Sequence, residues 1–225
     1  VRMPGGINPA KDVDRYRVPA SRIRFLTVEE IEAHLEALVS SPALHAMVAL
    51  YIFAGLRREE ALWLRLNDID LPHGMLRVRA KTVLGETWEP KTKVNRTVPV
   101  SAALRRILEA YEPAASIGRW YFPSPQGQRW DPDNFSAALR KRNKQLGFEW
   151  TCLDYRHTFG SHLAMKGESL YKISTLMGNS PEICRRHYAA LLPESLVDSV
   201  EFFPEKQKPE PTPPRVEPTP GRPHL

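Results

Sequence analysis

The chain has 225 residues, of which 42% are hydrophobic and 26% charged, so one large domain with a substantial core is expected. Its two cysteines, Cys152 and Cys184, are too few for a disulfide framework, and no histidine pair or carboxylate cluster has metal-ligand spacing. No run approaches 18 apolar residues, and the first residues lack the apolar core of a signal peptide. We therefore predict a reduced, cytoplasmic protein that uses no membrane, metal or cofactor. The net charge of +6 favours polyanions without proving one as partner.

The two ends of the chain differ from its middle. Residues 1–25 mix proline and charged residues without a sustained apolar period, which predicts an interdomain linker. The chain begins at Val1 and not at methionine, so we expect a fragment of a longer protein. Residues 204–225 hold eight of the 21 prolines, which predicts a disordered tail. The remaining residues, 26–203, are expected to form one domain.

The first half of this domain reads as helices followed by strands. Thr27 begins a helix with a capping box that ends at Glu30, and residues 43–54 are apolar on all sides, as in a fully buried helix. A short helix is predicted over 59–66. Residues 75–79 and 96–100 alternate as strands do, with a turn at Gly85.

The second half returns to helical periodicity. Helices are predicted from Ser101, from about Asp133, and over 154–166, 168–177, 181–190 and 194–203. Two basic clusters, at 140–144 and 185–187, lie within these helices. The fold class is therefore mainly α with a small antiparallel β-sheet (α+β).

Four segments carry a recognisable pattern. They read A-G-L-R-R-E-E-A-L at 54–62 with L-N-D-I-D at 66–70, P-K-T-K-V-N-R-T-V-P at 90–99, D-Y-R-H-T-F-G-S-H at 154–162, and M-G-N-S at 177–180. Tyr188 follows Asn179 by nine residues. In their order and intervals, these segments resemble the boxes of tyrosine recombinases, the phage-integrase family. The resemblance covers residues 25–203 and implies the family's catalytic fold, with a three-stranded sheet.

The resemblance implies a role for each matching residue. It places the two active-site arginines at Arg57 and Arg156, a supporting glutamate at Glu60, and the nucleophile at Tyr188. The catalytic lysine, eight residues before the hairpin proline, is Lys91, with Lys93 as the alternative; the remaining site positions are Leu153, His157 and Asn179.

These residue types suit attack on a phosphodiester. Two arginines can hold the non-bridging oxygens and stabilise charge that develops in the transition state. A deprotonated phenol attacks phosphorus and forms a covalent 3′-phosphotyrosine, while a lysine can protonate the 5′ leaving oxygen.

Two positions depart from the family pattern. Leu153 stands where the family has histidine or lysine, and Asn179 stands where it has histidine or tryptophan. Loss of a proton-transfer group typically costs about 10²–10⁴-fold in rate. We therefore predict a slower enzyme, or one in which His157, His187 or a water substitutes.

Each residue also has a simpler interpretation. Arg57 could form only an i, i+3 ion pair with Glu60, Lys91 could be a solvated hairpin lysine, and Tyr188 could be a packed aromatic. His157 on this view is a core histidine, as the family pattern gives it no direct chemistry.

The resemblance implies a site-specific recombinase or integrase of a mobile element that acts on double-stranded DNA as a homotetramer on two sites. No small-molecule substrate is implied. The alternatives are a type IB topoisomerase-like activity, a non-catalytic DNA-binding descendant and a generic basic domain.

Overall fold

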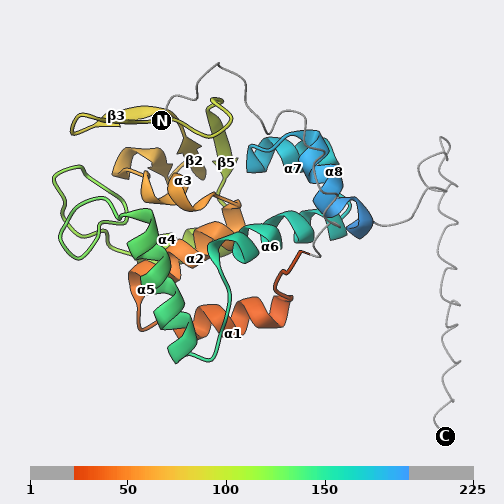
Figure 1. Cartoon of the computed structure of the whole chain (residues 1–225), viewed down its shortest axis with the longest axis horizontal. Helices are drawn as coiled ribbons and strands as arrows, with labels where there is room; N and C mark the ends of the chain where they lie inside the picture. The colour runs from red at the N-terminus through yellow and green to blue at the C-terminus, as the bar shows by residue number, and fades with distance from the viewer. Residues whose placement is uncertain (1–22, 193–225) are drawn as a thin grey trace, which may run out of the picture. The chain divides into compact units, whose positions relative to one another are not determined.

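The computed structural model describes residues 23–192 (Figure 1). Its helices are α1 (Val28–Leu38), α2 (Pro42–Ala54), α3 (Arg58–Leu62), α4 (Ala102–Ala110), α5 (Pro132–Gln145), α6 (Cys152–Met165), α7 (Leu170–Met177) and α8 (Pro181–Tyr188), with 3₁₀ turns η1 (Leu66–Asp68) and η2 (Ala189–Leu191). Its strands are β1 (Ile69–Asp70), β2 (Met75–Val78), β3 (Lys81–Val83), β4 (Glu86–Trp88) and β5 (Arg96–Pro99). The predicted fold class is confirmed.

Helix α2 forms the centre of the main core. Its residues 46–52 are all buried, as their apolar sequence predicted, and α1, α4 and α6 pack around it. The predicted start of α1 is confirmed: the Thr27 hydroxyl accepts a hydrogen bond from the Glu30 backbone N–H at 3.2 Å, and the Glu30 carboxylate accepts one from the Thr27 N–H at 2.8 Å.

The three-stranded sheet is antiparallel, in the order β1-β2-β5. Leu76 on β2 lies opposite Ile69 and Val98, and both Leu76 and Val98 are buried. Strands β3 and β4 form a separate two-stranded hairpin. Its turn residues, Leu84 and Gly85, have φ values of 52° and 84°, as a two-residue turn of a right-twisted hairpin requires. The predicted turn at Gly85 is therefore confirmed.

The short helix predicted over 59–66 ends earlier, at Leu62. The backbone beyond it is used for pairing with a distant segment: the Tyr121 N–H donates to the Leu64 carbonyl at 2.8 Å, and the Leu66 N–H donates to the Arg119 carbonyl at 3.1 Å. These contacts replace the helical hydrogen bonds. Periodicity alone could not reveal them because the two segments are more than 50 residues apart.

Helices α6, α7 and α8 follow one another at the C-terminal end of the described residues (Figure 1). They enclose a second buried cluster of Ala164, Ile173, Met177, Cys184 and Tyr188. The predicted helices over 154–166, 168–177 and 181–190 are confirmed with small shifts of their ends. Among residues 23–192, no helix is long and apolar enough to cross a membrane.

The proposed linker and the C-terminal segments lie largely outside the described residues. Of the linker, residues 23–25 are described and have no regular secondary structure. Leu26 is buried against α6, where its N–H donates to the Thr158 hydroxyl at 3.0 Å. The predicted helix at 194–203 and the tail at 204–225 fall beyond residue 192.

Candidate active site

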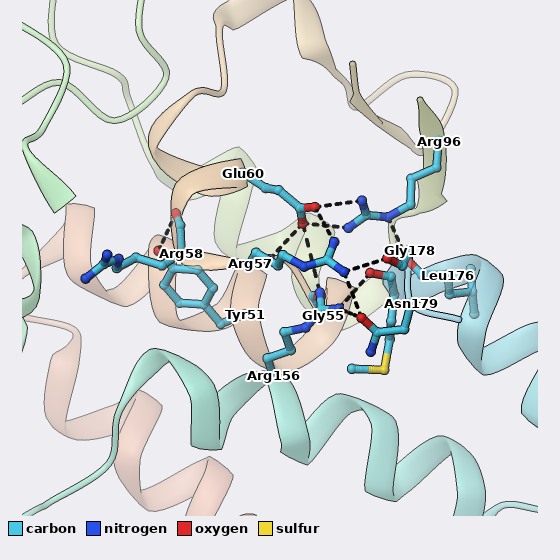
Figure 2. Close-up of polar contacts among 11 residues, drawn as sticks. Tyr51, Gly55, Arg57, Arg58, Glu60, Arg96, Arg156, Leu176, Gly178 and Asn179 are labelled. Atoms are coloured by element: carbon cyan, nitrogen blue, oxygen red, sulfur yellow. Dashed lines mark hydrogen bonds and ion pairs between the residues drawn. The ribbon is translucent and has the colours of Figure 1, made fainter. Parts of the chain in front are cut away.

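Glu60, on α3, is the centre of a buried charge cluster (Figure 2). Its carboxylate accepts hydrogen bonds from Arg57 Nη1 at 2.8 Å and from Arg96 Nη1 and Nη2 at 2.9 and 2.6 Å. It also accepts the Arg57 backbone N–H at 2.7 Å, and Arg156 Nη1 lies 3.9 Å away. Burial alone would raise the pKa of Glu60, but the hydrogen bonds and charges of Arg96 and Arg57 lower it to about 2. The carboxylate is therefore ionised at neutral pH.

The two predicted arginines lie side by side and share one acceptor. Arg57 Nη2 donates to the Gly178 carbonyl at 2.5 Å and to Asn179 Oδ1 at 2.7 Å. Arg156 Nη2 donates to the same Asn179 Oδ1 at 3.0 Å and to the Met177 carbonyl at 2.7 Å. The structure thus brings Arg57, Arg156, Glu60 and Asn179 together.

Helix C-termini supply the carbonyl acceptors of this cluster. Gly55 ends α2 and Gly178 ends α7, both in the left-handed conformation with φ of 61° and 63°. The last carbonyls of a helix lack partners within it and carry partial negative charge, which favours a nearby cation. Arg156 Nη1 donates to the Gly55 carbonyl, and Arg96 Nε donates to the Leu176 carbonyl at 2.9 Å.

Arg96 is a member of the cluster that the sequence analysis did not assign to the site. Its side chain is only 7% exposed, and it forms the bidentate contact with Glu60. A sequence signal for it does exist. On strand β5, Arg96 shares a face with Val98, which is buried, so alternation places the arginine toward the interior.

Tyr188 is the last residue of α8, and its side chain is almost fully buried against α6. Its hydroxyl lies 3.0 Å from His157 Nδ1. Burial raises the pKa of Tyr188, against the charge of Arg156, which lowers it. The ring rests on Gly160 of α6, where an added Cβ would come within 2.4 Å of Tyr188 Cζ. The protein therefore holds the phenol protonated and closely packed.

Lys91 lies in the loop between β4 and β5, not on a strand of the hairpin. It is exposed, and it lines a cavity of about 930 Å³ together with Arg57, Arg156, Asn179 and Tyr188. Lys93, the alternative lysine, is not among the residues that line this cavity, and its Nζ lies 3.6 Å from Glu89 Oε1.

Leu153 and His157 also line this cavity. Leu153 is 60% exposed and lies one turn before His157 on α6. The position at which the family pattern has a basic residue thus presents an apolar side chain to the cavity.

The simpler interpretation of Arg57 describes part of its environment. The ion pair with Glu60 is present, but Arg57 also reaches α7 and remains 22% exposed. Arg156 does not pair with Asp154, whose carboxylate accepts instead from Thr151. The arginines therefore belong to a network that joins segments more than 100 residues apart.

Comparison with known proteins shows the class of protein that carries this site. The model of the phage integrase family matches residues 24–194, so the chain belongs to this family. The tyrosine recombinase XerC of Thermodesulfovibrio yellowstonii is 28% identical over 77% of this chain, which spans 60% of that protein's length. Among solved structures, the XerA recombinase matches 88% of this chain and 67% of its own, with 20% identity and a TM-score of 0.64. The structure of the Tn1549 transposon integrase in complex with a circular intermediate DNA matches 81% of this chain and 65% of its own, with 17% identity and a TM-score of 0.63.

Proposed function

We propose that this chain is the catalytic part of a site-specific DNA recombinase that cuts and rejoins DNA through a 3′-phosphotyrosine intermediate. One observation carries the proposal. Residues from five separate segments of the chain, namely Arg57, Lys91, Arg156, Asn179 and Tyr188, line a single cavity. We propose residues 26–203 as the catalytic domain, between a linker at 1–25 and a tail at 204–225.

Arg57 and Arg156 are proposed to hold the two non-bridging oxygens of the scissile phosphate. Both already converge on Asn179 Oδ1, so a phosphate oxygen can take the place of that amide oxygen. Rotation of the Asn179 amide would then present its NH₂ group to the phosphate. Glu60 holds Arg57 through Nη1, while the Nη2 groups of Arg57 and Arg156, which now donate to Asn179, are the ones proposed to bind the substrate.

Tyr188 is proposed as the nucleophile and Lys91 as the acid for the 5′ leaving oxygen. The new bond joins Tyr188 Oη to phosphorus, and the bond between phosphorus and O5′ breaks. The phosphodiester energy is kept in the phosphotyrosine, so the return reaction needs no ATP. No cofactor or metal enters this scheme.

Double-stranded DNA is the proposed partner, and its use would place the protein in the bacterial cytoplasm. Arg140 and Lys144 on α5 line the same cavity and can contact phosphates beside the cleavage point. Because such contacts release counterions, we expect DNA affinity to fall steeply with salt. The relatives are named recombinases and integrases, which supports strand exchange over relaxation by a type IB topoisomerase.

A homotetramer on two DNA sites is part of the proposal. An apolar cavity of about 840 Å³ lies among α1, α2, α4 and α6, lined by Ile31, Leu35, Phe53, Ile107 and Leu163 among others. Residues 194–203, with Leu196, Val200 and Phe203 at helical spacing, are the proposed occupant from a neighbouring copy. Light scattering with site DNA should then show a tetramer that is lost when the chain stops at 193.

Covalent capture tests the proposed chemistry. The full chain is incubated with nicked duplex DNA at low salt in EDTA and then denatured, and a DNA–protein adduct is expected. The adduct should vanish in Tyr188→Phe and should survive EDTA, because no metal takes part.

Two further outcomes decide the residue roles. Lys91→Ala should form adduct about 10²–10⁴-fold more slowly than the wild type if Lys91 is the acid, whereas Lys93→Ala should not. An adduct that persists in Tyr188→Phe, or one that maps to another residue, would overturn the proposal.

A further inference from the structure

Tyr188 has to lose a proton before it can attack, and the family's residue for proton transfer at position 153 is here a leucine. We infer that His157 takes the proton from Tyr188, and so replaces the missing group from one helical turn further along α6. This inference rests on the proposed function, since it names the base for that reaction.

Contact geometry carries the assignment. His157 Nδ1 lies 3.0 Å from Tyr188 Oη, within the range that direct proton transfer needs. Within residues 23–192, no other side chain forms a hydrogen bond with this hydroxyl. His187, the other imidazole nearby, has its ring centroid 6.0 Å from that of Tyr188, with no hydrogen bond between them.

Helix geometry explains how a histidine at 157 can replace one at 153. Positions 153, 157 and 160 lie at i, i+4 and i+7 and share one face of α6. Position 160 is a glycine, and the Tyr188 ring rests on it. The missing Cβ lets the phenol lie low on α6, with its hydroxyl beside His157. Gly160 thus provides the space that the Tyr188–His157 contact needs.

The surroundings of His157 disfavour its charged form. Burial, with His187 on α8 and the adjacent Arg156, lowers its pKa to about 4, against Asp154, which raises it. His157 is thus neutral at pH 7. The inference requires the tautomer with its proton on Nε2, in which Nδ1 accepts the hydrogen bond of the Tyr188 hydroxyl.

The step balances without another reactant. The phenol proton moves from Tyr188 Oη to His157 Nδ1, the phenolate oxygen bonds to phosphorus, and O5′ leaves with a proton from Lys91. In the return reaction the attacking 5′ hydroxyl gives its proton back to Lys91 as it bonds to phosphorus and displaces Tyr188, and the His157 imidazolium returns the other proton to the phenolate.

Nuclear magnetic resonance tests the resting state without DNA. In full-length protein labelled with ¹⁵N-histidine, the neutral His157 ring should carry its proton on Nε2. The Nδ1 resonance should shift in Tyr188→Phe and stay unchanged in the distant Tyr171→Phe. A proton on Nδ1 would overturn the inference, because the phenol oxygen would then be the acceptor.

Kinetics then test the base against a merely structural role. On the duplex that gives an adduct with the wild type, His157→Gln should react about 10²–10⁴-fold more slowly. The matched variant His187→Gln removes a neighbouring imidazole that does not touch the hydroxyl, and a smaller loss is expected. Equal losses, or a larger loss in His187→Gln, would overturn the assignment.

Sulfur in place of the bridging O5′ separates base from acid, because a thiolate leaves without protonation. This substrate should restore adduct formation to Lys91→Ala and leave His157→Gln slow. Rescue of His157→Gln would overturn the inference. A wild type that forms no adduct on any duplex would contradict the proposed function, and the resonance experiment would then decide the Tyr188–His157 contact by itself.

Discussion

The charge cluster around Glu60 and the pocket that holds the Tyr188 ring both border one cavity, which Arg57, Arg156 and Tyr188 line, but the two regions are held together by different forces. Around Glu60, three arginines exchange several charged hydrogen bonds with the carboxylate, helix-end carbonyls and Asn179. Around Tyr188, apolar packing and a single hydrogen bond to His157 position the ring. Each region holds one of the two departures from the family pattern. In the network, Asn179 still accepts hydrogen bonds from both arginines. Beside the tyrosine, Leu153 offers no base, and His157 contacts the hydroxyl from one helical turn further along α6.

Glu60→Gln should be the most destabilising of the changes that test this contrast. Loss of the carboxylate charge leaves Arg57, Arg96 and Arg156 close together without a counter-charge. Breaking a buried charge pair typically costs about 3–5 kcal/mol of unfolding free energy. Denaturant unfolding at pH 7 measures this loss of stability. Glu59→Gln, on the same helix but exposed, should change little; equal effects would contradict the central role of Glu60.

Acid should weaken the same cluster in the wild type. The pKa of Glu60 is about 2 in the folded protein against 4.5 for an ordinary glutamate, so its contribution is complete above pH 4.5 and is lost as pH falls toward 2. That difference corresponds to about 3 kcal/mol at most. The gap in stability between wild type and Glu60→Gln should therefore narrow across this range. A gap that stays constant would show that Glu60 is not held ionised by the arginines.

Gly160→Ala tests the pocket by shape. The new Cβ would overlap Tyr188 Cζ, and overpacking typically costs about 1–3 kcal/mol. The Tyr188 hydroxyl should also leave His157, which the Nδ1 resonance reports.

Removal of the ring should reverse the sign of this effect. In a Tyr188→Ala background the overlap is gone, so Gly160→Ala should stabilise the protein by about 0.5–1 kcal/mol through helix propensity. Destabilisation in both backgrounds would place the cost elsewhere on α6.

The same contrast explains what could be predicted from sequence. Arg57, Glu60, Arg156 and Tyr188 were assigned because their box residues and intervals match a family pattern. The Arg96 contact was missed because it joins strand β5 to α3 and α7 across the chain, and strand alternation only hints at it. The 3.0 Å contact of His157 with Tyr188 depends on how α6 and α8 pack, which no local pattern determines.

Helix and strand positions followed from local patterns, such as the Thr27 cap and the Leu84–Gly85 turn. The early end of α3 did not, because its backbone pairs with residues 119–121. Local chemistry thus fixed most element positions, and long-range pairing fixed the exceptions.

Asn179 accepts from Arg57 and Arg156 and lines the same cavity as Tyr188, and two substitutions there should act in opposite directions. Asn179→Asp puts a carboxylate between Arg57 and Arg156, which should stabilise the fold by about 1 kcal/mol. The same charge competes with the phosphate, so adduct formation should slow. Asn179→His restores the donor of the family pattern and should speed adduct formation. If Asp speeds the reaction or His slows it, Asn179 does not face the phosphate.

Leu153→His should have the smallest effect on stability and is the sharpest test of the pocket. Position 153 is exposed, and substitutions at such positions usually change unfolding free energy by less than about 0.5 kcal/mol. If His157 already accepts the proton, the second imidazole should add little to the wild-type rate of adduct formation. In His157→Gln it should restore a large part of the lost rate, because it returns a base to the same face of α6. A large gain in the wild type with no rescue of His157→Gln would instead show that position 153 remains the site of proton transfer and that His157 only packs against the ring.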